Sequence, residues 1–342
     1  MRIFVCEYVT GGGLLSATLP PSLRREGAMM VRTLLRDLAG VAGVTLTASR
    51  DPRIPFNELA PPGVAVGWSV PATAEDVWPL WRRCVAEADA IWPIAPETGG
   101  QLERFVEMVV AHGKIPLCST IEAIHITSSK WKTAHLLAAN GIAVVPTHRA
   151  AELFPDSRSG WVAKPDDGAG AEDTCWFGDP ERMQRWLDQG GRRQTHVVQP
   201  YIQGDAASLS ALARDGVARV LSCNRQNITI EYGRFRYHGG IVGGLQARRR
   251  AFAPLAAGMA KAIPGLWGYI GVDLIESPEG LLVLEVNPRL TTSYVGLAAA
   301  IGRNPAAMVL ALLADGSDLP AVPKTVSPVT VEVDLEETAL HA

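Results

Sequence analysis

Two apolar segments near the C-terminal end of the chain, joined by a short turn, impose the strongest constraint on its fold. Residues 268–276 (G-Y-I-G-V-D-L-I-E) and 281–287 (L-L-V-L-E-V-N) have the apolar, β-branched composition of strands, and residues 277–280 (S-P-E-G) have that of a turn. The pattern predicts a β-hairpin. Because successive side chains of a strand point to opposite faces, the hairpin also decides which of its polar residues can meet.

Three oxygen-bearing side chains of this hairpin are expected to converge. Pairing about the turn places Asp273 opposite Glu285 or one residue away, and the period of a strand puts Glu285 and Asn287 on one face. Carboxylates within apolar strands are costly unless they are paired or bound to a metal, and hard oxygen ligands suit Mg²⁺ better than Zn²⁺. The sequence therefore predicts a magnesium site. The alternative is that the two acids are solvated at the ends of the strands.

The composition narrows the class of protein. A chain of 342 residues is long enough for two or three domains, and its net charge of -3 gives no general attraction to nucleic acid or anionic membranes. Five scattered cysteines without a C-x-x-C pair argue against a disulfide framework and a zinc site. Neither a signal peptide nor an apolar stretch of membrane-spanning length is evident. We therefore expect a cytoplasmic protein that binds neither nucleic acid nor membranes.

The first 118 residues alternate between strand-like and helix-like segments. Strands are predicted at 2–8, 44–48, 90–95 and 115–118, and helices at 22–38, 73–88 and 101–112. The alternation predicts an α/β domain with a parallel sheet. Two features at its strand ends are candidates for ligand contacts. The glycine run at 10–13 either binds an anion or only serves a strand-to-helix turn, and Glu97 either holds a cationic amine or only begins the next helix.

A second unit is predicted over residues 119–198. Its helices are expected at 130–140 and 180–188, and its strands at 142–146, 161–165 and 196–199. One of these strands carries Lys164 into a loop of small residues at 166–171. A lysine followed by such a loop favours phosphate binding, although the spacing is not that of a Walker motif.

A third unit is predicted over residues 199–315, followed by a loosely packed tail over residues 316–342. A break at 200–205 has the composition of a hinge. Antiparallel strands are then expected at 207–214, 217–223 and 227–232, and helices at 248–263 and 304–314. The second half of the chain is thus predicted to be α+β, and it includes the hairpin with the predicted metal site.

Taken together, the motifs of the second half resemble those of the ATP-grasp superfamily of carboxylate-amine ligases. They are Lys130, Lys164 with its loop, the hinge at 199–202, Asp273, and Glu285-Val286-Asn287. Each motif alone is loose, but their order is specific. The resemblance covers residues 119–312. It implies a pre-ATP-grasp domain at 1–118, an ATP-grasp small subdomain at 119–198, and a C-terminal subdomain with the metal site at 199–315.

The resemblance also implies a role for each motif. In the family, two lysines reach the phosphates of ATP, a glycine-containing loop closes over them, the hinge presents backbone groups to adenine, and a D…E-x-N set holds two Mg²⁺ ions, for which Mn²⁺ can substitute. By position these roles fall on Lys130 and Lys164; on Gly168 and Gly170; on Gln199, Tyr201 and Ile202; and on Asp273, Glu285 and Asn287. Asp205 is placed at the ribose and Arg289 at the acyl-phosphate.

Three shorter segments resemble, more narrowly, the tyramine-glutamate ligase group of methanofuran biosynthesis. They are E-Y-V-T-G-G-G at 7–13, I-A-P-E at 94–97 and N-P-R-L-T-T-S-Y-V-G-L at 287–297. The resemblance implies an ATP-dependent ligase that joins the γ-carboxylate of L-glutamate to tyramine or tyrosine through an acyl-phosphate, in the biosynthesis of a methanofuran-like cofactor. One position departs: several amino-acid ligases carry an arginine two residues before the metal aspartate, where this chain has Gly271. Charge stabilisation then falls on Arg289 or Arg225.

Other functions are compatible with the same pattern. One is another ATP-grasp ligase reaction, of the D-alanine-ligase or carbamoyl-phosphate-synthetase type. Another is a nucleotide-binding regulator that has lost catalysis. Glu97 and Asp166 are the candidates for accepting the proton of the amine, and a homodimer is expected from the resemblance alone.

Overall fold

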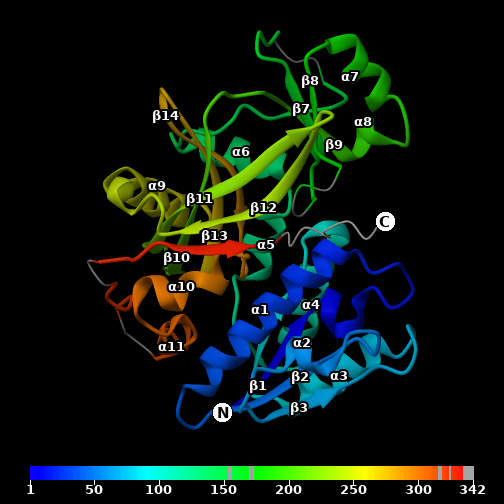
Figure 1. Ribbon diagram of the computed structural model, residues 1–342, viewed down its shortest axis with the longest axis vertical. Helices are drawn as coiled ribbons and strands as arrows, with labels where there is room; N and C mark the ends of the chain where they lie inside the picture. Colours follow the sequence, from blue (N-terminus) through cyan, green and yellow to red (C-terminus); the bar gives the residue numbers. More distant parts are fainter. Residues whose placement is uncertain (153–155, 169–170, 172, 315–317, 323–324, 334–342) are drawn as a thin grey trace, which may run out of the picture.

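Two sheets organise the chain, one in its N-terminal part and one in its C-terminal part (Figure 1). The computed structural model describes residues 1–152, 156–168, 171, 173–314, 318–322 and 325–333. Within these residues no helix is both long and apolar enough to cross a membrane.

The N-terminal sheet is parallel and is covered by helices on both faces. Its order is β3 (Val66–Ser69), β2 (Thr45–Ser49), β1 (Arg2–Glu7), β4 (Ala90–Ile94) and β5 (Ile115–Pro116). In β1, Ile3 and Val5 pack with α1 (Pro21–Ala39), while Phe4 and Cys6 pack with α3 (Val77–Glu87) and α4 (Gln101–Ala111). A central strand buried on both faces requires an unbroken apolar run, which explains why β1 is polar only at its two ends.

Two helices lead from this sheet to the second one: α5 (Ile121–Thr127) and α6 (Lys130–Ala139). The side chain of Ser129 accepts a hydrogen bond from the backbone N–H of Lys132 and so fixes the start of α6. Gly141 follows the helix with a φ of 73°, the left-handed conformation that commonly ends a helix. The cap matters for function because it makes Lys130 the first residue of α6.

The second sheet is antiparallel and joins two subdomains. The small one contributes β6 (His148–Arg149), β7 (Trp161–Pro165), β8 (Cys175–Phe177) and β9 (His196–Pro200), with α7 (Pro180–Leu187) and α8 (Arg192–Thr195). The large one contributes β10 (Asp205–Arg214), β11 (Val217–Glu231), β12 (Arg234–Val242), β13 (Gly268–Ser277) and β14 (Gly280–Asn287), with α9 (Arg249–Ala262). The strands follow the order β14-β13-β10-β11-β12-β8-β7-β9-β6. Alternate residues of β10, such as Leu209, pack against α9.

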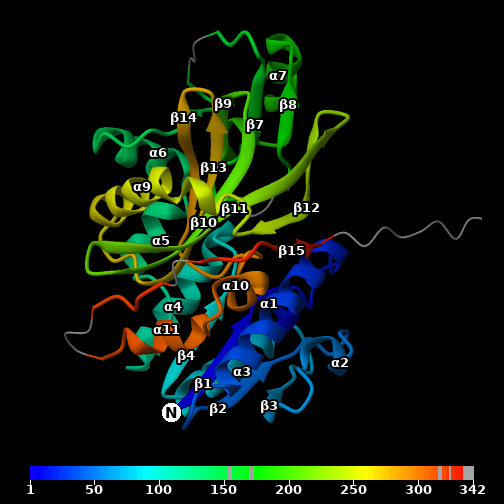
Figure 2. The ribbon, with the colours of Figure 1, turned by 60° about the vertical axis from the view of Figure 1, so that its left-hand side comes forward.

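The C-terminal helices α10 (Tyr294–Ile301) and α11 (Pro305–Ala311) fill the space between the two sheets (Figure 2). Leu297 and Val309 share one core with Leu34 of α1 and with Leu212 and Tyr269 of the second sheet. This shared core fixes the N-terminal domain against the large subdomain. Short turns of helix occur at η1 (Val9–Gly13), α2 (Phe56–Leu59), η2 (Thr98–Gly100) and η3 (Gln246–Arg248).

The structure differs from the predicted elements at several places. Residues 142–146 are not a strand, because Val144 makes only an isolated bridge to Val283. The strands predicted at 217–223 and 227–232 are one strand, β11, whose pairing with β12 shifts by a bulge after Asn227. The segments β3, β8, β12, α5 and α10 are not predicted, since they are short or, like β12, combine glycine with charged residues.

The prediction of a loosely packed tail is wrong for residues 329–333. Val329–Glu332 forms β15, which pairs antiparallel with β12. Val331 and Val333 are buried, as the two-residue period of a strand places them on one face. The high content of prolines and acids around this short V-T-V-E-V segment obscured its strand pattern.

Candidate active site

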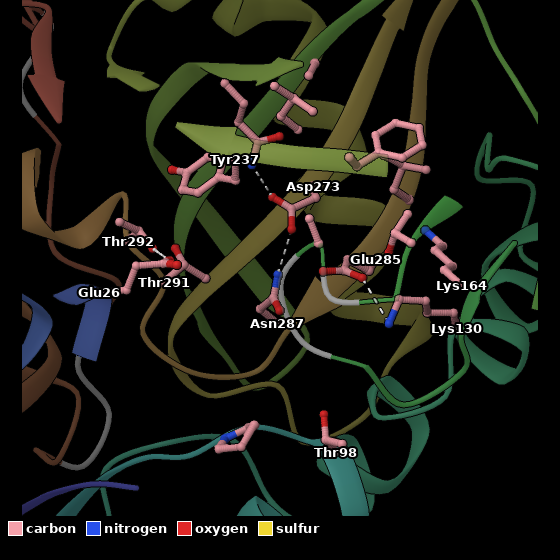
Figure 3. A pocket seen from close by; sticks show the side chains of 18 of the residues that line it. Glu26, Thr98, Lys130, Lys164, Tyr237, Asp273, Glu285, Asn287, Thr291 and Thr292 are labelled. Carbon is pink, nitrogen blue, oxygen red and sulfur yellow. Dashed lines mark hydrogen bonds and ion pairs between the residues drawn. The ribbon is translucent and has the colours of Figure 1, made fainter. Parts of the chain in front are cut away.

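A cavity of about 1200 Å³ lies between the N-terminal domain and the second sheet. The ends of β1 and β4 and one face of α1 line it from one side, and α6, β7, β9 and the strands β10 to β14 line it from the other. Ligands of open parallel sheets collect at the carboxyl ends of the strands, which is where this cavity meets the N-terminal sheet. Figure 3 shows part of its wall.

The three predicted metal ligands come together in this cavity. Asp273 of β13 is paired in register with Glu285 of β14, and Asn287 lies two residues further along β14. The Asn287 Nδ2 donates a hydrogen bond to Asp273 Oδ2 at 3.1 Å, and Gln226 Nε2 of β11 donates to Asp273 Oδ1 at 2.7 Å (Figure 3). The hairpin register therefore produces the convergence that the sequence predicts.

The charges at this place favour a bound cation. Burial, and then the neighbouring carboxylate of Glu285, raises the pKa of Asp273 to about 7. Burial also acts to raise the pKa of Glu285, but the ammonium groups of Lys130 and Lys164 outweigh it and lower that pKa. Two facing carboxylates with an amide oxygen nearby form a hard donor set that suits Mg²⁺. The described residues contain no group of three or more His, Cys, Asp or Glu suited to a metal, so Asn287 has to complete the set.

The two predicted phosphate lysines lie beside these acids. Lys130 Nζ lies 3.3 Å from Glu285 Oε2 and donates a hydrogen bond to the carbonyl oxygen of Gly168 at 2.5 Å. Lys164 on β7 is 8% exposed, and its burial lowers its pKa to about 8. Gly168 thus borders the site as predicted, whereas Gly170 lies outside the described residues.

The hinge between the subdomains also lines the cavity. Gln199, Tyr201, Ile202 and Asp205 all contribute to its wall, as the sequence predicts for a nucleotide site. Gln199 is buried, and its Nε2 donates a hydrogen bond to Thr147 Oγ1 at 2.9 Å. This bond fixes the side chain at the end of β9 and leaves its carbonyl oxygen as an acceptor.

Arg289 is held by a carboxylate from the other domain. Its Nε and Nη2 donate to the two oxygens of Glu97 at 3.0 and 2.8 Å, and its Nη1 donates to the carbonyl oxygen of Leu290. Only 11% of the Arg289 side chain and 7% of that of Glu97 are exposed. The sequence suggests Glu97 as the residue that holds the amine or takes its proton. Because Glu97 forms a buried, bidentate ion pair with Arg289, it is not available for either role.

Asp166 and Arg225 are placed less favourably for the roles considered for them. The carboxylate of Asp166 accepts hydrogen bonds from Ser129 Oγ and from the Trp131 N–H, so it holds the start of α6. Arg225 borders the cavity, but neighbouring residues of a strand point to opposite faces. Since Gln226 reaches Asp273, the alternation along β11 directs Arg225 away from the acids.

The glycine run after β1 does not offer its first backbone amides to an anion. The N–H groups of Val9 and Thr10 and the hydroxyl of Thr10 donate to the carboxylate of Glu7. Glu7 is buried, and the burial raises its pKa. The N–H groups of Val9 and Thr10 are therefore occupied by Glu7, and Val9 lines the cavity wall.

The sequence did not identify Gln226, Glu26 and Tyr237 as residues of the site. Gln226 belongs to the strand that the sequence divides in two. Glu26 lies on α1, which has the pattern of an ordinary amphipathic helix, and its side chain accepts a hydrogen bond from Thr292 Oγ1 at 2.8 Å. Tyr237 lies on the unpredicted strand β12. None of the three belongs to a motif, so only the fold brings them to the cavity.

The position of Gly271 explains the absence of an arginine two residues before Asp273. A Cβ atom at Gly271 would lie 2.5 Å from Thr291 Cγ2 and 3.0 Å from its Oγ1. The hydroxyl of Thr291 in turn hydrogen-bonds with that of Tyr269 at 3.0 Å. The segment after β14 therefore occupies the space that a longer side chain would need.

Gly271→Ala is expected to lower the free energy of unfolding by about 1–3 kcal/mol, because the added methyl group overpacks the contact with Thr291. Urea denaturation measures the loss. Thr291→Ala removes both close atoms. The free energy of unfolding of the double variant should therefore lie closer to that of Thr291→Ala alone than the value of Gly271→Ala lies to that of the wild type. Wild-type stability of the Gly271→Ala variant would show that the segment moves freely and does not fill this space.

Comparisons with known proteins support the same organisation. The family model described as an ATP-grasp domain matches residues 127–293, and the one described as a pre ATP-grasp domain matches residues 44–124. A putative ATP-grasp superfamily protein from Archaeoglobus fulgidus has a similar structure, with a TM-score of 0.69, 23% sequence identity, and coverage of 91% of this chain and 88% of that one.

Two curated relatives carry the name tyramine–L-glutamate ligase. The protein from Methanocaldococcus jannaschii is 26% identical over 204 residues, which are 60% of this chain and 56% of that protein. The protein from Methanocaldococcus fervens is 34% identical over 104 residues, which are 30% of this chain and 34% of that protein. The match thus spans just over half the length of the first relative and about a third of the second.

Proposed function

The chain belongs to the ATP-grasp superfamily, with a pre-ATP-grasp domain before its ATP-grasp domain, and on this premise we propose that it is an ATP-dependent carboxylate-amine ligase. We further propose L-glutamate, through its γ-carboxylate, as the donor and tyramine or tyrosine as the acceptor, in the biosynthesis of a methanofuran-like cofactor. The observation that carries the proposal is that Asp273, Glu285 and Asn287 lie beside two lysines in one cavity. The names of the two relatives support the substrates.

The reaction requires the carboxylate to be activated, because a carboxylate is a poor electrophile. A γ-carboxylate oxygen attacks the γ-phosphorus of ATP, the bond to the β,γ-bridging oxygen breaks, and ADP leaves. The amine then attacks the carbonyl carbon of the acyl-phosphate and loses a proton, while the C–O bond to phosphate breaks. Both steps develop negative charge on phosphoryl oxygens, so positioned positive charge is the main contribution expected from the protein.

The polar residues of the cavity would have separate roles in this reaction. Lys130 and Lys164 would bind the phosphates of ATP, since both ammonium groups already lie beside the acids. Asp273, Glu285 and Asn287 would hold Mg²⁺, two ions by the family resemblance. Bound Mg²⁺ would screen the charge that otherwise repels the incoming carboxylate. Arg289, oriented by Glu97, would face the transferring phosphoryl group.

The hinge would bind the nucleoside. Gln199, Tyr201 and Ile202 line the cavity where β9 ends, and Asp205, the first residue of β10, lines it as well. We assign adenine to Gln199, Tyr201 and Ile202, and the ribose to Asp205. We also propose that residues 1–118 form one domain and that residues 119–198 and 199–315 form two subdomains. The substrates would bind between these three parts.

The full chain, incubated with ATP, Mg²⁺, L-glutamate and a panel of amines, tests the proposal. ADP release should require glutamate and an amine together, and mass spectrometry should detect the condensed product. Products formed from D-alanine or bicarbonate instead would favour the related ligase chemistries. Thermal stabilisation by ATP without any product would indicate a nucleotide-binding regulator.

A further inference from the structure

Residues 97–99, which follow β4 in the N-terminal domain, contact both subdomains of the second half of the chain. Glu97 forms the ion pair with Arg289, which follows β14 of the large subdomain. The next two residues contact the small subdomain. Thr98 Oγ1 donates a hydrogen bond to the carbonyl oxygen of Asp167 at 3.0 Å, and the Gly99 N–H donates to Asp167 Oδ2 at 2.9 Å. Three consecutive residues of one domain therefore hold a residue of each subdomain.

The conformation of this segment depends on its glycines. Gly99 and Gly100 have φ values of 63° and 68°, in the left-handed region that favours glycine. The turn η2 that they form lines the cavity through Thr98 and Gly99, and Figure 3 shows Thr98 below Lys130 and Asn287. The sequence T-G-G thus produces a turn that offers a hydroxyl and a backbone N–H to the same partner.

The partner of this turn, Asp167, lies between two residues that contact Lys130. The backbone N–H of Lys130 donates a hydrogen bond to the carbonyl oxygen of Asp166 at 3.0 Å, and its Nζ donates to that of Gly168 at 2.5 Å. The carboxylate of Asp166 holds the start of α6, as described above. Residues 166–168, called the β7 turn below because they follow β7, therefore determine where the ammonium of Lys130 lies.

Asp167 acts on the site without facing it. Thr98, Gly99 and Lys130 line the cavity, whereas the described residue Asp167 does not. A carboxylate directed at the phosphates of ATP would repel them, but this one accepts a hydrogen bond from Gly99 instead. The two bonds to Asp167 thus connect the β7 turn to the N-terminal domain and leave Lys130 as the group that faces the ligand.

We propose that Asp167 is a positioning residue: held by Thr98 and Gly99, it fixes the β7 turn and, through the turn, the ammonium of Lys130 for the terminal phosphates of ATP. The inference rests on the part of the proposed function in which Lys130 binds those phosphates. It adds the N-terminal domain to the parts that determine nucleotide affinity. Adenine and ribose, which we assign to the hinge, should not depend on this contact.

Two nucleotides test this division. The full chain is titrated with Mg²⁺ and the β,γ-imido analogue of ATP, and separately with AMP, by isothermal calorimetry. Thr98 and Gly99 are exposed, so the loss of one hydrogen bond should have a modest effect. Asp167→Ala should raise the Kd of the analogue by about 3–10-fold. The Kd of AMP should stay near the wild-type value, because AMP lacks the two phosphates beside Lys130.

Conservative variants and a matched control make the test specific. Asp167→Asn keeps an acceptor oxygen and should raise the Kd of the analogue less than Asp167→Ala. Thr98→Val, which removes the hydroxyl, should raise it more than Thr98→Ser. In the control, Asp179→Ala, the lost carboxylate also accepts a backbone N–H, from Glu181 at 2.9 Å, but it caps α7 within the same subdomain. The control should leave both Kd values unchanged. Thermal melting without nucleotide checks the fold of each variant.

The possible results separate this inference from the proposed function. A wild-type chain that does not bind the analogue would overturn both. If the wild-type chain binds it, an unchanged Kd in Asp167→Ala would overturn the inference alone. An equal rise in the Kd of AMP and of the analogue would do the same, since the whole nucleotide site would then be disturbed. The expected Kd values together with no condensed product from any donor and amine would overturn the ligase reaction and leave the inference supported.

Discussion

Replacing Glu285 by glutamine is expected to lower the turnover number by on the order of 10³-fold, because the variant loses the charge of a proposed metal ligand at the centre of the predicted phosphoryl-transfer site. Glutamine has nearly the same shape, so the β13–β14 hairpin and its register should persist. Lys130 loses its partner at 3.3 Å but keeps the carbonyl oxygen of Gly168 as an acceptor. The loss should therefore concern catalysis and metal binding rather than folding.

Two measurements separate these effects for Glu285→Gln. ADP release with glutamate and an amine reports turnover, and a titration with Mn²⁺ followed by electron paramagnetic resonance reports metal binding. Both should fall, while the thermal midpoint without metal stays near that of the wild type. Glu279→Gln, an exposed change in the turn of the same hairpin, should leave all three unchanged. Turnover at the wild-type rate in Glu285→Gln would remove this residue from the metal site.

The hairpin of β13 and β14 shows how far local patterns determine the site. The turn chemistry at 277–280 and the two-residue period of strands suffice to predict that Asp273 and Glu285 face each other, and the structure confirms the pairing. The helix cap before Lys130 and the short strand that carries Lys164 are local patterns as well, and both are present. The placement of these residues depends on local structure, and here the sequence predicts it.

The features of the site that the sequence missed depend on contacts between distant segments. Glu97 is separated from Arg289 by 192 positions, and no pattern within either segment indicates that the two form an ion pair. Glu26 reaches Thr292 only because α10 and α11 join the N-terminal domain to the second sheet in one core. Gln226 lies on β11 next to the bulge, in the gap between the two strands that the sequence predicts there. Such contacts follow from tertiary packing, which a single sequence does not specify.

Arg289→Ala is expected to lower the turnover number by about 10²–10³-fold, because no arginine at position 271 shares its electrostatic role. The same variant should also lose about 3–5 kcal/mol of unfolding free energy, since it leaves the carboxylate of Glu97 buried and unpaired. The two losses have different causes, and a single substitution cannot separate them. Arg185→Ala, which removes an exposed ion pair with Glu181, should change neither quantity appreciably and serves as the control.

The double variant Arg289→Met with Glu97→Leu separates catalysis from stability. Replacing both members of a buried ion pair by apolar side chains is often nearly neutral, so most of the lost unfolding free energy should return in urea denaturation. ADP release should stay as low as in Arg289→Ala, because the guanidinium is still absent. If turnover returned with stability, Arg289 would only join the two domains through Glu97. If neither returned, the pair would be needed to keep the cavity in its present shape.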